Sequence, residues 1–315
     1  MNSQGKARLL GTLLAGALLA GTPGLCRAAE PKAGFVFVDP YPHAPSHTLG
    51  ELGLEAIRED GVLVIHSQGN AKLAGEVARV LEMMNRLARS LVGSALRIHG
   101  LVLVPDRGLL PSDFQNRQWV NVDGVACLVL EQKETGLPFA DELSNYLAFP
   151  LLVHENVDLG LKAEVLGGGL TQDSVSSRWW VEGISDFCAY QAARKFQKGT
   201  VGYMQKTYRE GLQKLSQSEL DLEDTGTWWP KGGSGKPENV VFAYASAHYA
   251  ISALSADRGA GWIRRVLVQL KTEGKKGATT SADFCKAAGP LLGRDVAGFI
   301  RRIELARVKK FADSL

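Results

Sequence analysis

The sequence has no excess of basic residues once its first 29 residues are set aside. Lys6, Arg8 and Arg27 are three of its 36 basic residues, and no acidic residue precedes Glu30. The other 33 basic residues are therefore matched by 33 acidic ones. Nucleic-acid binding needs a basic patch or stripe, so we do not expect this near-neutral chain to bind nucleic acid.

The N-terminal segment also lacks an apolar run long enough to cross a bilayer comfortably. Lys6 and Arg8 precede the apolar run Leu9–Ala20, Thr22-Pro23-Gly24 breaks the run, and small residues follow at Ala28 and Ala29. This pattern predicts a secretory signal peptide over residues 1–29. The mature protein is then exported, periplasmic or extracellular, and has no stable membrane span. An uncleaved anchoring N-terminus and a lipidated Cys26 are the alternatives.

Cysteine is scarce in the rest of the chain. Only Cys127, Cys188 and Cys285 follow the signal segment, and none of them has C-x-x-C spacing. An exported protein can form one disulfide from these three, but three buried free thiols are the simpler interpretation. The composition, with 45% hydrophobic and 22% charged residues, is that of an ordinary globular protein.

The hydrophobic pattern predicts an α+β fold with two lobes, one over residues 30–170 and one over residues 171–315. Short β-branched runs and a strand pair around Asp123-Gly124 predict strands in the first lobe, and residues 71–91 have helical spacing. From about residue 140 the pattern is helical. Strands are expected at 34–38, 62–65, 101–104 and within 119–130; helices are expected to start near 150 and 178 and to cover 242–254, 261–272 and 295–311; loops are expected at 167–177 and 225–238.

The segment Leu151-Leu152-Val153-His154-Glu155-Asn156-Val157-Asp158 carries the strongest chemical signal. On a helix, His154 and Asp158 lie four residues apart and share a face. Two ligands at this spacing can hold one metal ion, with Glu155 beside a metal-bound water, as in the pattern H-E-x-x-H. Here the last position is aspartate, so the pattern is H-E-x-x-D.

A second segment, Arg178-Trp179-Trp180-Val181-Glu182-Gly183-Ile184-Ser185-Asp186, adds two carboxylates. Glu182 is a candidate third metal ligand. Asp186 lies one helical turn further on, where it can accept a hydrogen bond from the second ring nitrogen of His154 and fix the tautomer of that histidine.

Together the two segments resemble the gluzincin clan of zinc metallopeptidases, which includes thermolysin and the M1-type aminopeptidases. In that clan the second helix carries a ligand glutamate in a W-x-x-E-G setting, followed four residues later by an acidic residue. The resemblance implies a zincin-like two-lobe fold, a zinc ion on His154, Asp158 and Glu182, and a peptide or protein substrate. It also makes Tyr244 and His248 candidates for binding the oxyanion.

The aspartate at position 158, where the pattern has histidine, leaves open whether the protein is an active peptidase. Carboxylate oxygen can bind zinc, but it makes the metal less positive, so the metal activates its water less. Three outcomes follow. The metal binds through His154, Asp158 and Glu182; or His248 serves as a substitute ligand; or the metal is lost and the groove binds a ligand without catalysing a reaction. The sequence therefore supports two hypotheses, an exported metal-dependent peptidase with Glu155 as general base and a catalytically inactive binding module of the cell envelope.

Overall fold

The computed structural model describes residues 36–37, 47–59, 62–93, 96, 99–116, 119–131, 148–166, 177–196, 198–215, 218–224, 228, 237–273 and 279–315. The predicted signal peptide lies outside these residues, as do nearly all of the predicted loops at 167–177 and 225–238.

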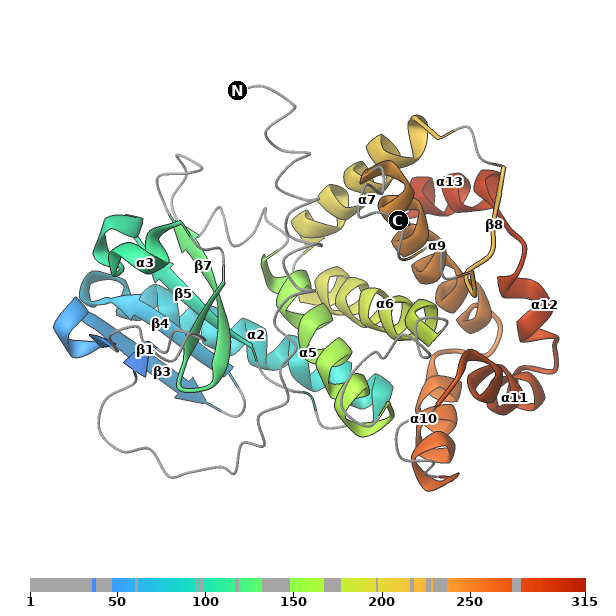
Figure 1. The fold of residues 1–315 in the computed structure, drawn as a ribbon, viewed down its shortest axis with the longest axis horizontal. Helices are drawn as coiled ribbons and strands as arrows, with labels where there is room; N and C mark the ends of the chain where they lie inside the picture. Colours follow the sequence, from blue (N-terminus) through green and yellow to red (C-terminus); the bar gives the residue numbers. More distant parts are fainter. Residues whose placement is uncertain are drawn as a thin grey trace.

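A seven-stranded mixed sheet forms the N-terminal lobe (Figure 1). Its strands lie in the order β2-β1-β6-β7-β5-β4-β3, and β4, β5 and β7 are parallel to one another. The strands are β1 (Val36–Phe37), β2 (His47–Thr48), β3 (Leu54–Glu59), β4 (Val62–Ser67), β5 (Gly100–Val104), β6 (Trp119–Val122) and β7 (Val125–Glu131).

The central strands are buried on both faces, which explains their continuous apolar runs. Val64 and Leu103 face the long helix α2 (Ala71–Val92), whereas Ile65 and Val102 face the other side, where they pack with Phe114. Phe114 belongs to the short helix α3 (Ser112–Gln115), which follows the 3-10 turn η3 (Arg107–Leu109). Two more 3-10 turns, η1 (Gly50–Leu52) and η2 (Gln68–Asn70), flank β3 and β4.

The predicted strand pair is the hairpin β6–β7. Its two turn residues, Asp123 and Gly124, both have positive φ angles, 50° and 79°. Left-handed backbone at both positions is typical of the two-residue turn that matches the twist of paired strands, and it explains the Asp-Gly sequence.

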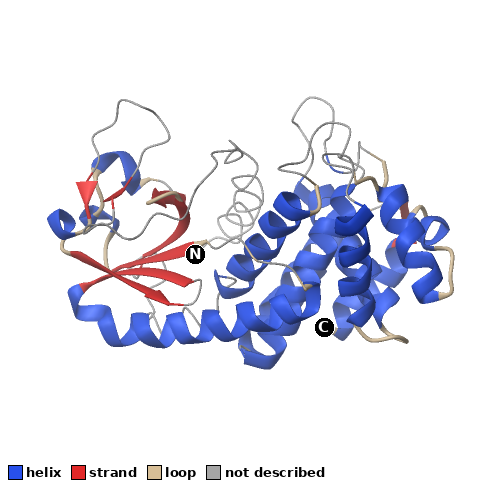
Figure 2. Ribbon diagram, turned by 90° about the horizontal axis from the view of Figure 1, so that it is seen from below, coloured by secondary structure: helices blue, strands red, loops and turns tan. Residues whose placement is uncertain are grey.

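Helix α2 (Ala71–Val92) runs along the sheet and continues into the helical lobe (Figure 2). Its buried residues recur every three or four positions, as its sequence predicts. It packs on β3 and β4 at the sheet and on α5, α6 and α10 in the other lobe. The helix ends at Gly93, whose left-handed φ of 68° lets its N–H bond the carbonyl of Arg89.

The C-terminal lobe is helical, and α6 lies at its centre, packed against α2, α5, α7 and α9. Pro150 lies in the first turn of α5, where its missing N–H is not needed. The helices are α5 (Ala148–Glu164), α6 (Arg178–Phe196), α7 (Lys198–Gln213), α9 (Pro237–Ser255), α10 (Gly261–Glu273), α11 (Ser281–Leu292), α12 (Val296–Ile300) and α13 (Leu305–Ser314).

The α+β prediction is confirmed, with a strand-containing lobe followed by a helical one. Helix α5, which the sequence division assigns to the first lobe, packs along α6; the boundary at residue 170 stays a prediction. The three described cysteines are buried free thiols, in agreement with the simpler interpretation of the sequence. None of the helices in the described part of the chain is long and apolar enough to span a bilayer.

The prediction of one helix over residues 295–311 is wrong. The chain forms α12, then the short strand β9 (Ile303–Glu304), and then α13. Strand β9 pairs with β8 (Glu219–Leu220) in a two-stranded sheet, and the N–H of Leu305 bonds the carbonyl of Ser218. This pairing is with a distant segment, so the local helical spacing could not indicate it.

Candidate functional site

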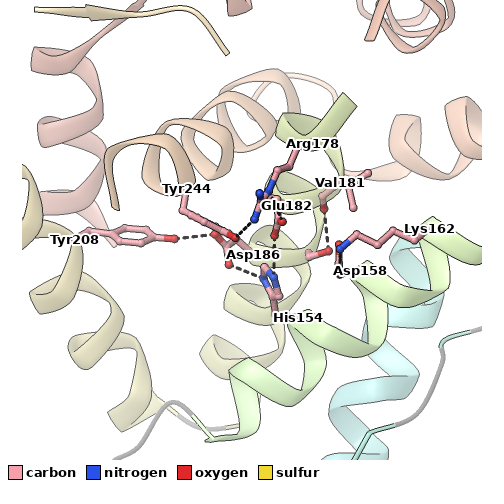
Figure 3. A network of polar contacts seen from close by, with 10 residues as sticks. His154, Asp158, Lys162, Arg178, Val181, Glu182, Asp186, Tyr208 and Tyr244 are labelled. Carbon is pink, nitrogen blue, oxygen red and sulfur yellow. Dashed lines mark hydrogen bonds and ion pairs between the residues drawn. The ribbon is translucent and has the colours of Figure 1, made fainter. Parts of the chain in front are cut away.

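Helices α5 and α6 bring the residues of both sequence segments together (Figure 3). Leu152, Val153, Val157 and Leu161 anchor α5 in the core. The polar residues His154, Glu155, Asp158, Glu182 and Asp186 then gather at the contact between the two helices. The first four of these side chains are buried, each no more than 8% exposed.

His154 lies between two carboxylates of α6. Its Nδ1 is 2.8 Å from Asp186 Oδ1, and its Nε2 is 3.1 Å from Glu182 Oε2. Burial alone would lower the pKa of His154, but the charges and hydrogen bonds of the two carboxylates raise it well above the usual value. Both ring nitrogens therefore face carboxylate oxygens, an arrangement that favours the protonated form of the histidine. Asp186 has the position that the sequence analysis gave it, and its second oxygen accepts from Tyr208 Oη at 3.1 Å.

Glu182 also contacts a guanidinium. Arg178 Nε donates to Glu182 Oε1 at 3.0 Å, and Arg178 Nη2 donates to Tyr244 Oη at 2.8 Å. The guanidinium lies 5.4 Å from the ring centroid of Trp228. Burial alone would raise the pKa of Glu182, but Arg178 and His154 lower it well below the usual range. Glu182 is therefore a fully ionised carboxylate held on both oxygens.

Asp158 pairs with an ammonium group from its own helix. Lys162, one turn later, donates to Asp158 Oδ2. The other oxygen, Oδ1, is buried and has no hydrogen-bond partner among the described residues. Burial and the nearby charge of Glu182 raise the pKa of Asp158, while Lys162 acts in the opposite direction.

Glu155, the predicted general base, is 8% exposed. Burial, and to a smaller degree the negative charges of Asp158 and Glu182, raise the pKa of Glu155 to about 7, although the charge of His154 opposes them. A carboxylate with this pKa exchanges protons near neutral pH, which suits a general base or acid.

The two oxyanion candidates have different surroundings. The Tyr244 ring lies 6.3 Å from the His154 ring, and its hydroxyl accepts from Arg178. His248 is fully buried among aromatic rings, including those of Tyr208 and Phe311. Its Nδ1 is 3.4 Å from Tyr208 Oη, and its Nε2 has no partner among the described residues. Tyr208 thus lies between His248 and Asp186. Tyr244 lies nearer to the predicted metal ligand His154.

Three members of this cluster, Lys162, Arg178 and Tyr208, were not predicted from the sequence. The signal for two of them was present. Lys162 follows Asp158 by four residues and Arg178 precedes Glu182 by four, so the helical spacing that placed the carboxylates also places these cations on the same faces. Tyr208 comes from α7, and no local pattern connects it to Asp186.

These residues fit a zinc ion only in part. Two donors on one tetrahedral zinc lie about 3.3 Å apart when each bond is about 2.0 Å, so the 3.1 Å between His154 Nε2 and Glu182 Oε2 is compatible with a metal. Asp158, the third candidate, pairs with Lys162 instead. Within the described ranges no three His, Cys, Asp or Glu side chains are arranged to hold a metal ion. As arranged, the set does not fit zinc.

Comparisons with known proteins give only distant structural likenesses. No protein-family model matches the sequence, and no curated protein matches it. Among solved structures, the chain is similar to a mutant M1 zinc metallopeptidase from Deinococcus radiodurans, with 14% identity, a TM-score of 0.45 and coverage of 78% of this chain and 51% of that one. It is also similar to yeast LTA4 hydrolase, with 10% identity, a TM-score of 0.49 and coverage of 90% and 43%. The chain therefore spans about half the length of these proteins.

Proposed function

We propose that this chain is a peptidase-fold binding module of the cell envelope that does not hydrolyse peptides through a metal. One observation carries the proposal: the Lys162 ammonium already pairs with Asp158, a carboxylate that would bind the metal. A metal-binding histidine must also be neutral, whereas the carboxylates on both sides of His154 raise its pKa and so favour its protonated form.

The same contacts give the cluster a structural role. Six side chains form a continuous series of hydrogen bonds and one ion pair that links α5, α6, α7 and α9: Tyr208, Asp186, His154, Glu182, Arg178 and Tyr244. Satisfied buried networks of this kind stiffen the helices that carry them. A stiff arrangement suits a protein that presents a fixed surface to a peptide, and export to the cell envelope would place peptides and envelope proteins within reach.

The metal-dependent peptidase is the second candidate. It is favoured by the 3.1 Å separation of His154 Nε2 and Glu182 Oε2, by the pKa of about 7 at Glu155, and by the unpartnered Oδ1 of Asp158. This candidate requires Lys162 to leave Asp158, so it predicts that zinc displaces the lysine.

Metal content and peptide hydrolysis, measured on the same preparation, separate the two candidates. The full chain is purified without chelator and analysed by elemental mass spectrometry, then assayed on a mixed peptide library. We expect substoichiometric metal, no cleavage, and no difference between the wild type and Glu155→Gln. Stoichiometric zinc, with cleavage that Glu155→Gln abolishes, would establish the peptidase instead.

Binding is tested directly with the same library. Hydrogen–deuterium exchange is measured with and without peptide, and the proposal expects slower exchange along α5 and α6. If no peptide changes the exchange of any segment, the binding module loses its support even when the metal result agrees with it.

A further inference from the structure

The two cations of the cluster differ in the way they approach their carboxylates. Arg178 contacts Glu182 at Oε1, the oxygen that does not face His154. It is held there by Tyr244 and Trp228 and is 3% exposed. A cation on this outer oxygen orients the carboxylate and leaves its inner oxygen, Oε2, directed at the histidine.

Lys162 is more exposed than Arg178. It contacts Asp158, and its charge acts on Glu182 and Glu155 as well. Its side chain is 21% exposed, and that of Asp158 is 5% exposed. A flexible ammonium on a four-carbon stem is here a positive point charge beside the carboxylate that the sequence pattern assigns to a metal ion.

Asp158 supplies an independent observation. Its Oδ1 is buried without a hydrogen-bond partner in the described part of the chain. An ionised carboxylate accepts on both oxygens, and leaving one of them unpaired in the interior costs free energy. Lys162 therefore bonds only one of the two carboxylate oxygens of Asp158, Oδ2. The other oxygen, Oδ1, belongs to a residue that the sequence pattern assigns to a metal.

We propose that Lys162 takes the place of a divalent cation in this cluster and excludes one, so that removing its charge creates a divalent-cation site on His154, Asp158 and Glu182. This inference rests on the proposed function, because it assumes that the native chain holds no metal. Without the ammonium, Asp158 has two oxygens to share, Glu182 Oε2 and His154 Nε2 already lie 3.1 Å apart, and His154 gives up its proton as the metal binds.

Lys162→Met tests the proposal, and Lys206→Met is the matched control. Lys206 also pairs with a carboxylate four residues away on its own helix, Glu210, but both side chains of that pair are exposed on the surface of α7. Zn²⁺ is titrated into each full-length variant against a competing chelator, and Co²⁺ is added separately so that its visible absorption reports the coordination geometry. We expect Lys162→Met to bind Zn²⁺ at least about tenfold more tightly than the wild type, since a neighbouring positive charge opposes a dication. The control should match the wild type, and adding Asp158→Asn to Lys162→Met should abolish the gain.

The possible failures are distinguishable. If the wild type itself binds one zinc tightly, both the inference and the proposed function are overturned. If folded Lys162→Met binds no more zinc than the wild type, the inference alone fails. Thermal unfolding checks that each variant is folded. Lys162→Gln keeps a hydrogen-bond donor for Asp158 without the charge, so it decides the matter if the methionine variant does not fold.

Discussion

Replacing Arg178 with methionine should destabilise the protein far more than removal of an ordinary ion pair. Arg178 is 3% exposed and Glu182 is also 3% exposed, so the substitution leaves an ionised carboxylate in the interior. Breaking a buried pair on one side costs about 3–5 kcal/mol, and the lost bond to Tyr244 Oη adds roughly 1 kcal/mol. Because a domain is typically stable by about 5–15 kcal/mol, the variant should fold but unfold at a much lower urea concentration.

The assay is urea unfolding followed by circular dichroism, carried out as a double-mutant cycle with Glu182→Gln. The double variant removes both charges and should regain most of the lost stability, with a coupling of at least about 2 kcal/mol. Lys206→Met is again the exposed control, and it should change stability little, because exposed pairs contribute little. If Arg178→Met unfolds at the same urea concentration as this control, the guanidinium does not compensate a buried carboxylate and our account of the site is wrong.

Three other predictions concern the rest of the molecule. A Cβ at Gly183 would lie 2.6 Å from a backbone oxygen of α9, so Gly183→Ala should cost about 1–3 kcal/mol in urea unfolding; Gly202→Ala, in an open part of α7, should be neutral or stabilising by up to about 1 kcal/mol. Burial lowers the pKa of His248 to about 4, below about 6.5 in the unfolded chain. The unfolded state therefore binds more protons between these values, and stability is lost as pH falls from about 6.5 toward 4. Replacing His248 with glutamine should reduce this loss by up to about 3 kcal/mol, measured by urea unfolding at several pH values; an unchanged pH dependence would show that His248 is not buried in neutral form. Burial also raises the pKa values of the Cys127 and Cys188 thiols, so iodoacetamide should label neither until the protein unfolds, as peptide mass spectrometry would show; rapid labelling of the folded protein would contradict their burial.

Local patterns were sufficient for much of the fold. The spacing of apolar residues in α2 predicts its length almost to the residue, and Asp123-Gly124 predicts the β6–β7 hairpin because both residues adopt left-handed backbone. Strand β3 was missed, since Glu55, Arg58 and Glu59 give its sequence a polar composition. It forms because β4 provides an antiparallel partner along its whole length.

The candidate site could be predicted only as far as helical spacing reaches. The order of His154 and Glu182 in the sequence, and the residues around each of them, suggested that the two side chains lie close together. The structure places His154 Nε2 3.1 Å from Glu182 Oε2. The sequence interpretation assigned Asp158 to a metal because aspartate can bind one. It did not weigh Lys162, whose identical spacing places a competing cation on the same carboxylate. Contacts between helices, such as Tyr208 with Asp186, depend on packing that no single segment encodes.

Helix α2 limits how the two lobes can move. A 22-residue helix is about 33 Å long, and this one packs on the sheet at one end and on α5, α6 and α10 at the other. Rotation of one lobe against the other would have to bend this helix or detach the apolar face of the helix from one of the two lobes. A hinge motion that opens and closes the space between the lobes is therefore not available through α2. The same continuity leads us to expect that heat or urea melts both lobes in a single transition.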